Sequence, residues 1–321
     1  MQKAGAQQDE EQTTGIHHIS AIVGNPQENV DFYAGVLGLR LVKKTVNFDD
    51  PETYHLYFGN EDGTPGTIIT FFPWSGSYKG RIGDGQVGVT TYVVPEGAFR
   101  FWENRFSALG IDWVRTDRFG EQYLRFEDPH GLKLEFVERE EGKMNTWEFG
   151  GVSKTEAIKG FGGAVLFSSN PQQTAALLEN IMGFERIDED GDLIRFKSPG
   201  EIGNTIDLKS TRGIRGLMGI GTVHHIAWRA VDDRDQLDWK RHLDANGFRA
   251  TPVQDRNYFN AIYFREDGEI LFEIATDPPG FAIDEPHDRM GERLMLPQQY
   301  EKHRAELEES LDPIEVKELD I

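Results

Sequence analysis

The sequence predicts an α+β fold in which four βαβββ modules form two half-barrel cups. Three observations predict it. Segments of similar pattern start near Gly15, Gln86, Phe161 and Thr222, which indicates a degenerate internal repeat. Each segment opens with a short apolar run typical of a strand, and a helix-like stretch follows. Each then ends with two or three further strand-like runs, so every segment reads as one module, and paired modules can close their sheets around a cup.

The first module shows the pattern best. Asn25-Pro26 predicts the start of a helix, with Asn as the cap and Pro at the first helical position, and Gly38 predicts its end. The third module repeats this signature, with Asn170-Pro171 at the start and Gly183 at the stop. The strands expected in the first module cover residues 15–23, 39–46, 53–58 and 66–72.

The second and fourth modules follow the same plan. Their helices are expected at 98–109 and 235–245, and their last strands at 132–137 and 269–275, with a further strand at 259–264. A last helix is expected over 298–311. The predicted organisation is a disordered tail at 1–14, an N-terminal domain at 15–140 with modules one and two, a linker at 141–159, a C-terminal domain at 160–276 with modules three and four, and an extension at 277–321.

Composition excludes several classes of function. The formal net charge of −21 over 321 residues repels nucleic acid and anionic membrane surfaces. The chain has no cysteine, which excludes disulfides, thiolate catalysis and zinc–thiolate sites, so a metal must be held by His, Asp or Glu. We see no transmembrane run and no secretory signal, so we expect a cytoplasmic protein.

Two histidine doublets carry the chemistry. His17-His18 and His224-His225 sit in the opening strands of modules one and four, while modules two and three have none there. Glu273 lies in an apolar strand, where a carboxylate needs compensation. Two imidazoles and one carboxylate are typical of a metal with open coordination positions. This pattern favours a cup shared by modules one and four, with pairing of one with two and three with four as the alternative.

Composition does not decide which histidine of each doublet would bind a metal. Ser20 shares a strand face with His18 and would place a hydroxyl there. Arg256 could bind an anionic oxygen and Tyr263 could exchange a hydrogen bond with a phenol, although a surface ion pair and a core tyrosine are the plainer interpretations. We read Glu135 and Asp207, in the last strands of modules two and three, as partly exposed or hydrogen-bonded, and His55 and His242 show no pattern.

Three stretches resemble a known family. They are GIHHISAIVGNPQENVDFYAGVLGLRLVKKTVNFDD, GTVHHIAWRA and DRNYFNAIYFREDGEILFEIATDPPGF. These stretches resemble the vicinal oxygen chelate superfamily, which includes extradiol dioxygenases, glyoxalase I and bleomycin-resistance proteins. Within it, the chain is most similar to ring-cleaving dioxygenases that act on hydroquinones, and the resemblance runs from about residue 15 to residue 318.

The resemblance implies Fe(II) held by His18, His225 and Glu273, with Mn(II) left open as the alternative ion. It implies roles near the substrate for His17, His224, Arg256 and Tyr263. The chlorohydroquinone enzymes carry Thr where this chain has Ser20, so the hydroxyl is kept.

The implied function is insertion of dioxygen into a hydroquinone-type diol, in quinone detoxification or aromatic degradation. The implied partners are a small aromatic diol and dioxygen, with no nucleic acid and no membrane, and a homo-oligomer is left open. The rival functions are an extradiol catechol dioxygenase, a glyoxalase-like enzyme, and a binding protein that sequesters quinones or drugs.

Overall fold

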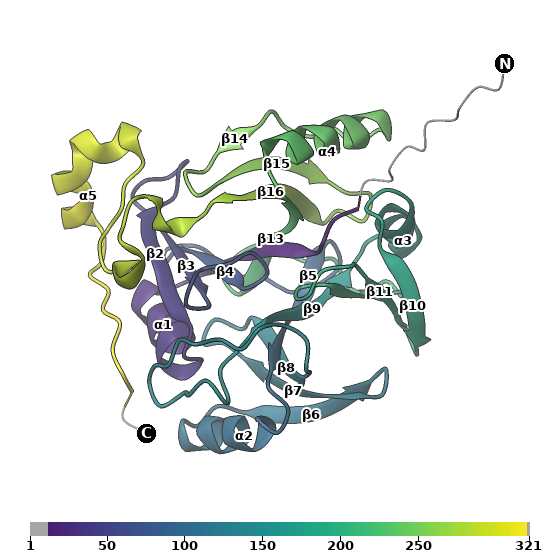
Figure 1. The fold of residues 1–321 in the computed structure, drawn as a ribbon, viewed down its shortest axis with the longest axis horizontal. Helices are drawn as coiled ribbons and strands as arrows, with labels where there is room; N and C mark the ends of the chain where they lie inside the picture. The colour runs from purple at the N-terminus through teal and green to yellow at the C-terminus, as the bar shows by residue number, and fades with distance from the viewer. Residues whose placement is uncertain (1–11, 320–321) are drawn as a thin grey trace.

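A computed structural model describes residues 12–319 of the chain. It contains two curled eight-stranded sheets, and each takes strands from both halves of the sequence. In Figure 1 the sheet of modules one and four lies in the upper part of the molecule and the sheet of modules two and three in the lower part. We call their concave interiors the first cup and the second cup. The α+β fold with four modules and two half-barrel cups is confirmed.

The first sheet has the strand order β14-β15-β16-β13-β1-β4-β3-β2. Its strands from module one are β1 (Ile16–Val23), β2 (Arg40–Val46), β3 (Tyr54–Gly59) and β4 (Ile68–Pro73). Its strands from module four are β13 (Thr222–Ala230), β14 (Gln254–Asp255), β15 (Phe259–Arg265) and β16 (Leu271–Pro279). The two modules meet where β1 pairs antiparallel with β13, so the sharing of one cup by modules one and four is confirmed.

The second sheet has the order β10-β11-β12-β9-β5-β8-β7-β6 and joins module two to module three through the antiparallel pair β5 and β9. The strands of module two are β5 (Gln86–Val94), β6 (Trp113–Arg118), β7 (Glu121–Glu127) and β8 (Lys133–Glu138). Those of module three are β9 (Gly160–Phe167), β10 (Glu185–Asp190), β11 (Leu193–Lys197) and β12 (Thr205–Lys209).

The module helices start close to where the sequence predicts. They are α1 (Pro26–Val30) continued by the π-helix η1 (Asp31–Val36), α2 (Phe99–Ala108), α3 (Pro171–Asn180) and α4 (Asp233–Ala245). The Asn25 side chain accepts a hydrogen bond from the Glu28 N–H, as expected of the cap. The fourth helix begins at Asp233 rather than 235, because the Asp232 carboxylate caps it by accepting from Asp235 N–H.

Strand alternation separates the core from the cup. In β16, Phe272 and Ile274 pack in the main hydrophobic core together with Trp239 of α4. The neighbours Glu273 and Ala275 point to the other face, and Ala275 belongs to a smaller apolar cluster with Tyr57 and Phe259. Pairing of strands therefore fixes which side chains can meet inside the first cup.

The C-terminal extension packs on module one, as the yellow segment beside β2 shows in Figure 1. It contains the short 3₁₀ turns η2 (Phe281–Ile283), η3 (His287–Arg289) and η4 (Gln298–His303), followed by α5 (Arg304–Ser310). The helix predicted over 298–311 is thus a 3₁₀ turn followed by a short α-helix. Met295 N–H donates to the Lys44 carbonyl and Tyr300 donates to the Phe48 carbonyl, which ties the extension to β2 and to the loop after it.

Most of the tail predicted at 1–14 lies outside the described residues. Of its last residues, Thr13 is buried and donates to the Arg229 carbonyl. Within residues 12–319, no helix has the length and apolarity that crossing a membrane requires.

Candidate metal centre

The first histidine of each doublet is the extra residue of a β-bulge. Along the β1–β13 pair, Ile16 faces Trp228 while His18 faces Ala227, which leaves His17 without a partner. On the other strand, the register passes over His224 in the same way. A bulge turns a side chain away from strict alternation. Each doublet therefore brings both its imidazoles together instead of sending them to opposite faces.

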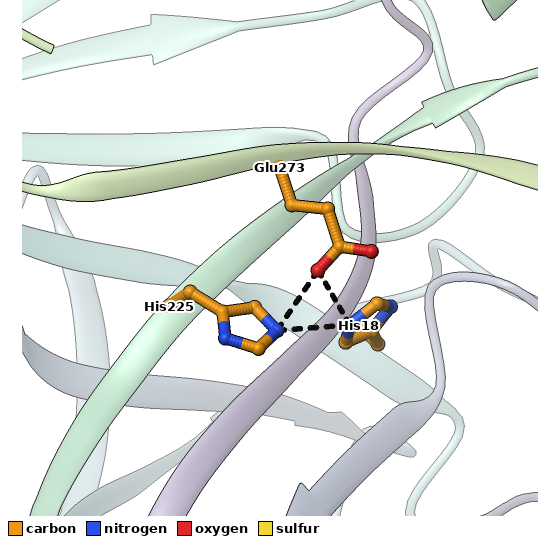
Figure 2. A group of neighbouring side chains, drawn as sticks. All are labelled: His18, His225 and Glu273. Carbon is orange, nitrogen blue, oxygen red and sulfur yellow. Dashed lines mark hydrogen bonds and ion pairs between the residues drawn. The ribbon is translucent and has the colours of Figure 1, made fainter. Parts of the chain in front are cut away.

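Three strands bring His18, His225 and Glu273 to one point in the first cup (Figure 2). The Nε2 atoms of the two histidines are 3.3 Å apart. Oε2 of Glu273 lies 3.3 Å from Nε2 of His18 and 2.9 Å from Nε2 of His225. All three residues are buried, so these ligand-type atoms face one another in a space with little access to water.

The hydrogen bonds of His17 orient the ring of His18. Nε2 of His17 lies 3.1 Å from the Thr276 carbonyl oxygen, which can only accept, so this nitrogen carries the proton. Burial, with His18 beside it, holds the pKa of His17 well below its ordinary value, so the ring is neutral and its Nδ1 is an acceptor. His18 then donates from Nδ1 to Nδ1 of His17 across 2.9 Å, and its Nε2 faces the centre.

The second doublet repeats this arrangement. Nδ1 of His224 and Nδ1 of His225 are 2.8 Å apart, and Nε2 of His225 likewise faces the centre. Burial lowers the pKa of His225 despite the adjacent Glu273 carboxylate. Burial also favours the neutral form of Glu273, but His18 and His225 outweigh it and hold its pKa below the ordinary range. Two imidazole nitrogens and one carboxylate oxygen thus converge on one point, and such a set of ligand atoms suits a cation.

A cavity of about 520 Å³ opens onto this point. Its wall includes His18, His225, His224, Ser20, His55, Tyr57, Arg256 and Tyr263. The guanidinium of Arg256 donates from Nε to the Tyr263 hydroxyl across 3.3 Å and from Nη2 to Gln254. Its charge also lies over the rings of Phe48 and Tyr263. The predicted neighbours Arg256, Tyr263 and Ser20 therefore share one cavity with His18 and His225.

The structure separates the two remaining histidines. His224 lines the cavity, and among residues 12–319 its Nε2 has no hydrogen-bond partner. His17 has both ring nitrogens engaged and does not line the cavity. His17 is therefore placed to orient His18, whereas His224 is placed to meet a ligand.

Sequence reasoning missed His55. It lies on β3, is buried, and faces the cavity between the rings of Tyr57 and Phe72, with ring centroids 4.1 and 4.3 Å away. No repeat marks it in the sequence. The signal for His55 in the sequence was a histidine near aromatic residues in a predicted strand. This combination is too common to identify a site by itself.

The second cup has ion pairs at Glu135 and Asp207, which hold the strand position of Glu273, and no histidines at the positions of the two doublets. Gly88 and Gly162 are the bulged residues there. The interpretation of Glu135 and Asp207 as partly exposed is wrong, since both are buried, and the interpretation as hydrogen-bonded is confirmed. Arg118 bridges the two carboxylates, and Arg195 pairs with Asp207 across 2.7 Å. Guanidinium groups from other strands of the sheet compensate the buried charge, which only the folded sheet can reveal.

Comparison with known proteins identifies the family. Residues 15–136 and 160–284 match the Glyoxalase/Bleomycin resistance protein/Dioxygenase superfamily. The chain belongs to this superfamily. It is 68% identical over 308 residues to a Bacillus subtilis protein named "Putative ring-cleaving dioxygenase MhqO", a match that covers 96% of this chain and 99% of that protein.

Two further similarities narrow the group within the superfamily. The chain is 33% identical to a chlorohydroquinone/hydroquinone 1,2-dioxygenase of Sphingobium indicum, covering 95% of this chain and 98% of that one. A crystal structure described as a "putative dioxygenase from Bacillus subtilis" superposes with a TM-score of 0.96 at 68% identity, covering 96% of this chain and all of the other. These similarities place the chain among the ring-cleaving dioxygenases of the superfamily.

Proposed function

We propose that the chain is a non-haem Fe(II)-dependent dioxygenase that inserts dioxygen into a hydroquinone-type aromatic diol. In this proposal His18, His225 and Glu273 hold the metal. The observation that carries it is the convergence of two imidazole nitrogens and a buried carboxylate within 3.3 Å of one another. The hydroquinone dioxygenase of Sphingobium indicum, similar along nearly the whole chain, supports the choice of substrate class.

Fe(II) held by His18, His225 and Glu273 would supply Lewis-acid and redox chemistry for the diol and dioxygen. Side chains of the protein would bind the diol and compensate its charge. His224 lines the cavity with an Nε2 that has no partner among residues 12–319, so it is placed to exchange a hydrogen bond with a diol oxygen. The guanidinium of Arg256, held by Tyr263 and Gln254, would offset the negative charge of the ionised oxygen.

The cavity suits a single aromatic ring. Phe72, Trp74 and Phe259 supply apolar walls, and the loop that carries Phe48 closes one side. Trp74 Nε1 donates to Asp50 and Tyr300 donates to the Phe48 carbonyl, so this loop is held from both ends. Detoxification of quinones and hydroquinones, or degradation of aromatic compounds, would be the setting for such an activity.

Anaerobic reconstitution with Fe(II), followed by oxygen-uptake measurements on methylhydroquinone and on catechol, tests the proposal. We expect uptake with the para-diol and a ring-opened semialdehyde acid as product. Reconstitution with Mn(II) in parallel decides between the two ions. Preferential uptake with catechol would assign the chain to extradiol catechol cleavage instead, and no uptake with any diol would overturn the proposal.

A further inference from the structure

Four polar side chains form a continuous hydrogen-bonded row across the wall of the first cup. Tyr57 and His55 come from β3, Thr70 from β4 and Ser20 from β1. The Tyr57 hydroxyl lies 3.0 Å from Nδ1 of His55, and Nε2 of His55 lies 2.9 Å from the Thr70 hydroxyl. The Thr70 hydroxyl lies 2.6 Å from that of Ser20. All four are buried, and the row ends at Ser20, which lines the cavity next to His18.

The row lies in module one at strand positions that correspond to those around Glu273 in module four. Thr70 corresponds to Glu273, because Thr70 pairs with Ser20 in the same register in which Glu273 pairs with Ala227. Tyr57 corresponds to Tyr263 in the same way, since Tyr57 faces Thr70 and Tyr263 faces Glu273. Glu135 and Asp207 hold the same register in modules two and three. Module one is thus the module with a hydroxyl at this position, where the other three have carboxylates. This difference leaves room for a neutral row of hydrogen bonds instead of an ionic one.

The Tyr57 end of the row fixes which atom donates in each of these hydrogen bonds. Among the described residues, Nδ1 of His55 is the only acceptor within hydrogen-bond distance of the Tyr57 hydroxyl. A buried hydroxyl proton without an acceptor is costly, so Tyr57 donates to His55. Burial, followed by the nearby His18 and His225, holds the pKa of His55 well below its ordinary value, so its ring is neutral and offers one donor and one acceptor. The proton of His55 therefore sits on Nε2 and is donated to Thr70.

The same reasoning continues to the cavity. Thr70 accepts from His55, and the remaining partner for its own proton is the Ser20 oxygen. Ser20 accepts from Thr70 and has no other partner among residues 12–319, so its proton is free to point into the cavity. The opposite direction would leave the Tyr57 proton buried without an acceptor.

We propose that Tyr57, His55 and Thr70 form a positioning relay that holds the Ser20 hydroxyl as a hydrogen-bond donor toward a ligand oxygen in the cavity. The direction of the relay is independent of the ligand, whereas the nature of the ligand, an ionised phenolic oxygen, rests on the proposed function. A hydroxyl fixed as a donor prefers an anionic oxygen to a protonated one. The relay thereby selects the ionised form of the diol.

The first test determines the tautomer of His55 in the absence of metal and substrate. Metal-free protein labelled with ¹⁵N-histidine is examined by long-range ¹H–¹⁵N NMR, and the His55 signals are assigned by their absence in His55→Gln. We expect a single Nε2–H tautomer in the wild type and a mixture of tautomers in Tyr57→Phe. The control is Tyr33→Phe, which removes a buried hydroxyl that donates to Asp128 outside the row and should leave the His55 signals unchanged. A proton on Nδ1 in the wild type would overturn the relay.

The second test measures binding of 4-nitrophenolate, a coloured phenolate, to protein loaded with redox-inert Zn(II). We expect Ser20→Ala to weaken binding roughly tenfold or more, the loss of one charge-assisted hydrogen bond. His55→Phe should weaken it to a similar extent, and the double variant no further, because both changes remove the same donor. His55→Gln, which keeps a donor and an acceptor, should restore most of the affinity. Tyr33→Phe again serves as the control.

The outcomes separate the two proposals. Additive losses in the double variant, or unchanged binding in His55→Phe, would overturn the relay even if the enzyme consumes oxygen. A single Nε2–H tautomer that depends on Tyr57 would support the relay even if no diol were turned over. Circular dichroism and urea unfolding of each variant show whether it is folded before its binding is compared.

Discussion

Replacing Glu273 with Gln should abolish most of the stabilisation that a divalent metal gives to this protein. The substitution keeps the size of the side chain and removes the one negative charge among the three converging atoms. In the wild type, Oε2 of Glu273 lies 2.9 Å from Nε2 of His225 and 3.3 Å from Nε2 of His18, so one ion can contact all three. The variant keeps the two imidazoles but offers a neutral amide in place of the carboxylate.

The size of the effect follows from mass action. A ligand at one hundred times its dissociation constant stabilises the folded state by about 2.7 kcal/mol. For a chain of this size that raises Tm by roughly 5 °C. If the variant binds about a hundredfold more weakly, the same metal concentration stabilises it by only about 0.4 kcal/mol, or roughly 1 °C.

The assay is calorimetry or dye-monitored unfolding under anaerobic conditions, with and without Fe(II), and with Mn(II) in parallel. Glu135→Gln is the matched control, because Glu135 holds the same strand position in module two but faces arginines instead of histidines. This control should lower the metal-free stability and leave the metal-dependent rise in Tm intact. A wild type with no metal-dependent rise, or a Glu273→Gln protein with the full rise, would refute the reasoning.

Two further predictions concern stability. Lys43 is buried with its Nζ 2.5 Å from Asp284 and 2.6 Å from Glu285, so Lys43→Met leaves these carboxylates unpaired and should cost about 3 kcal/mol in urea unfolding; a change below about 1 kcal/mol would contradict this. Although burial alone would raise the pKa of Glu121, hydrogen bonds from Arg139, Tyr123 and Arg195 outweigh it and lower the pKa from near 4.5 to about 2. Because the folded-state pKa is lowered, its stabilisation is present above pH 4.5 and is lost as the pH falls toward 2. The free energy of unfolding should therefore fall less between pH 5 and pH 3 in Glu121→Gln than in the wild type, and equal losses would contradict the prediction.

The sequence alone determined the modules and the candidate ligands. Asn25-Pro26 and Asn170-Pro171 mark helix starts because capping depends on adjacent residues. The histidine doublets and Glu273 could be found because a polar group in an apolar strand needs a compensating partner. These features are local, so they can be read from the order of residues.

The doublets favoured a cup shared by modules one and four, but only the tertiary structure decided the strand register and the contacts within that cup. The antiparallel pairing of β1 with β13 joins segments from opposite ends of the chain, and the bulges at His17 and His224 turn both doublets inward. His55 joins the site through Tyr57 and Thr70, which lie on its own strand and the neighbouring one. The arginines of the second cup likewise come from other strands, since Arg118 of β6 pairs with Glu135 of β8 and Arg195 of β11 pairs with Asp207 of β12. Such contacts arise from strand register and the burial of charge between distant segments, and no local pattern in the sequence records either.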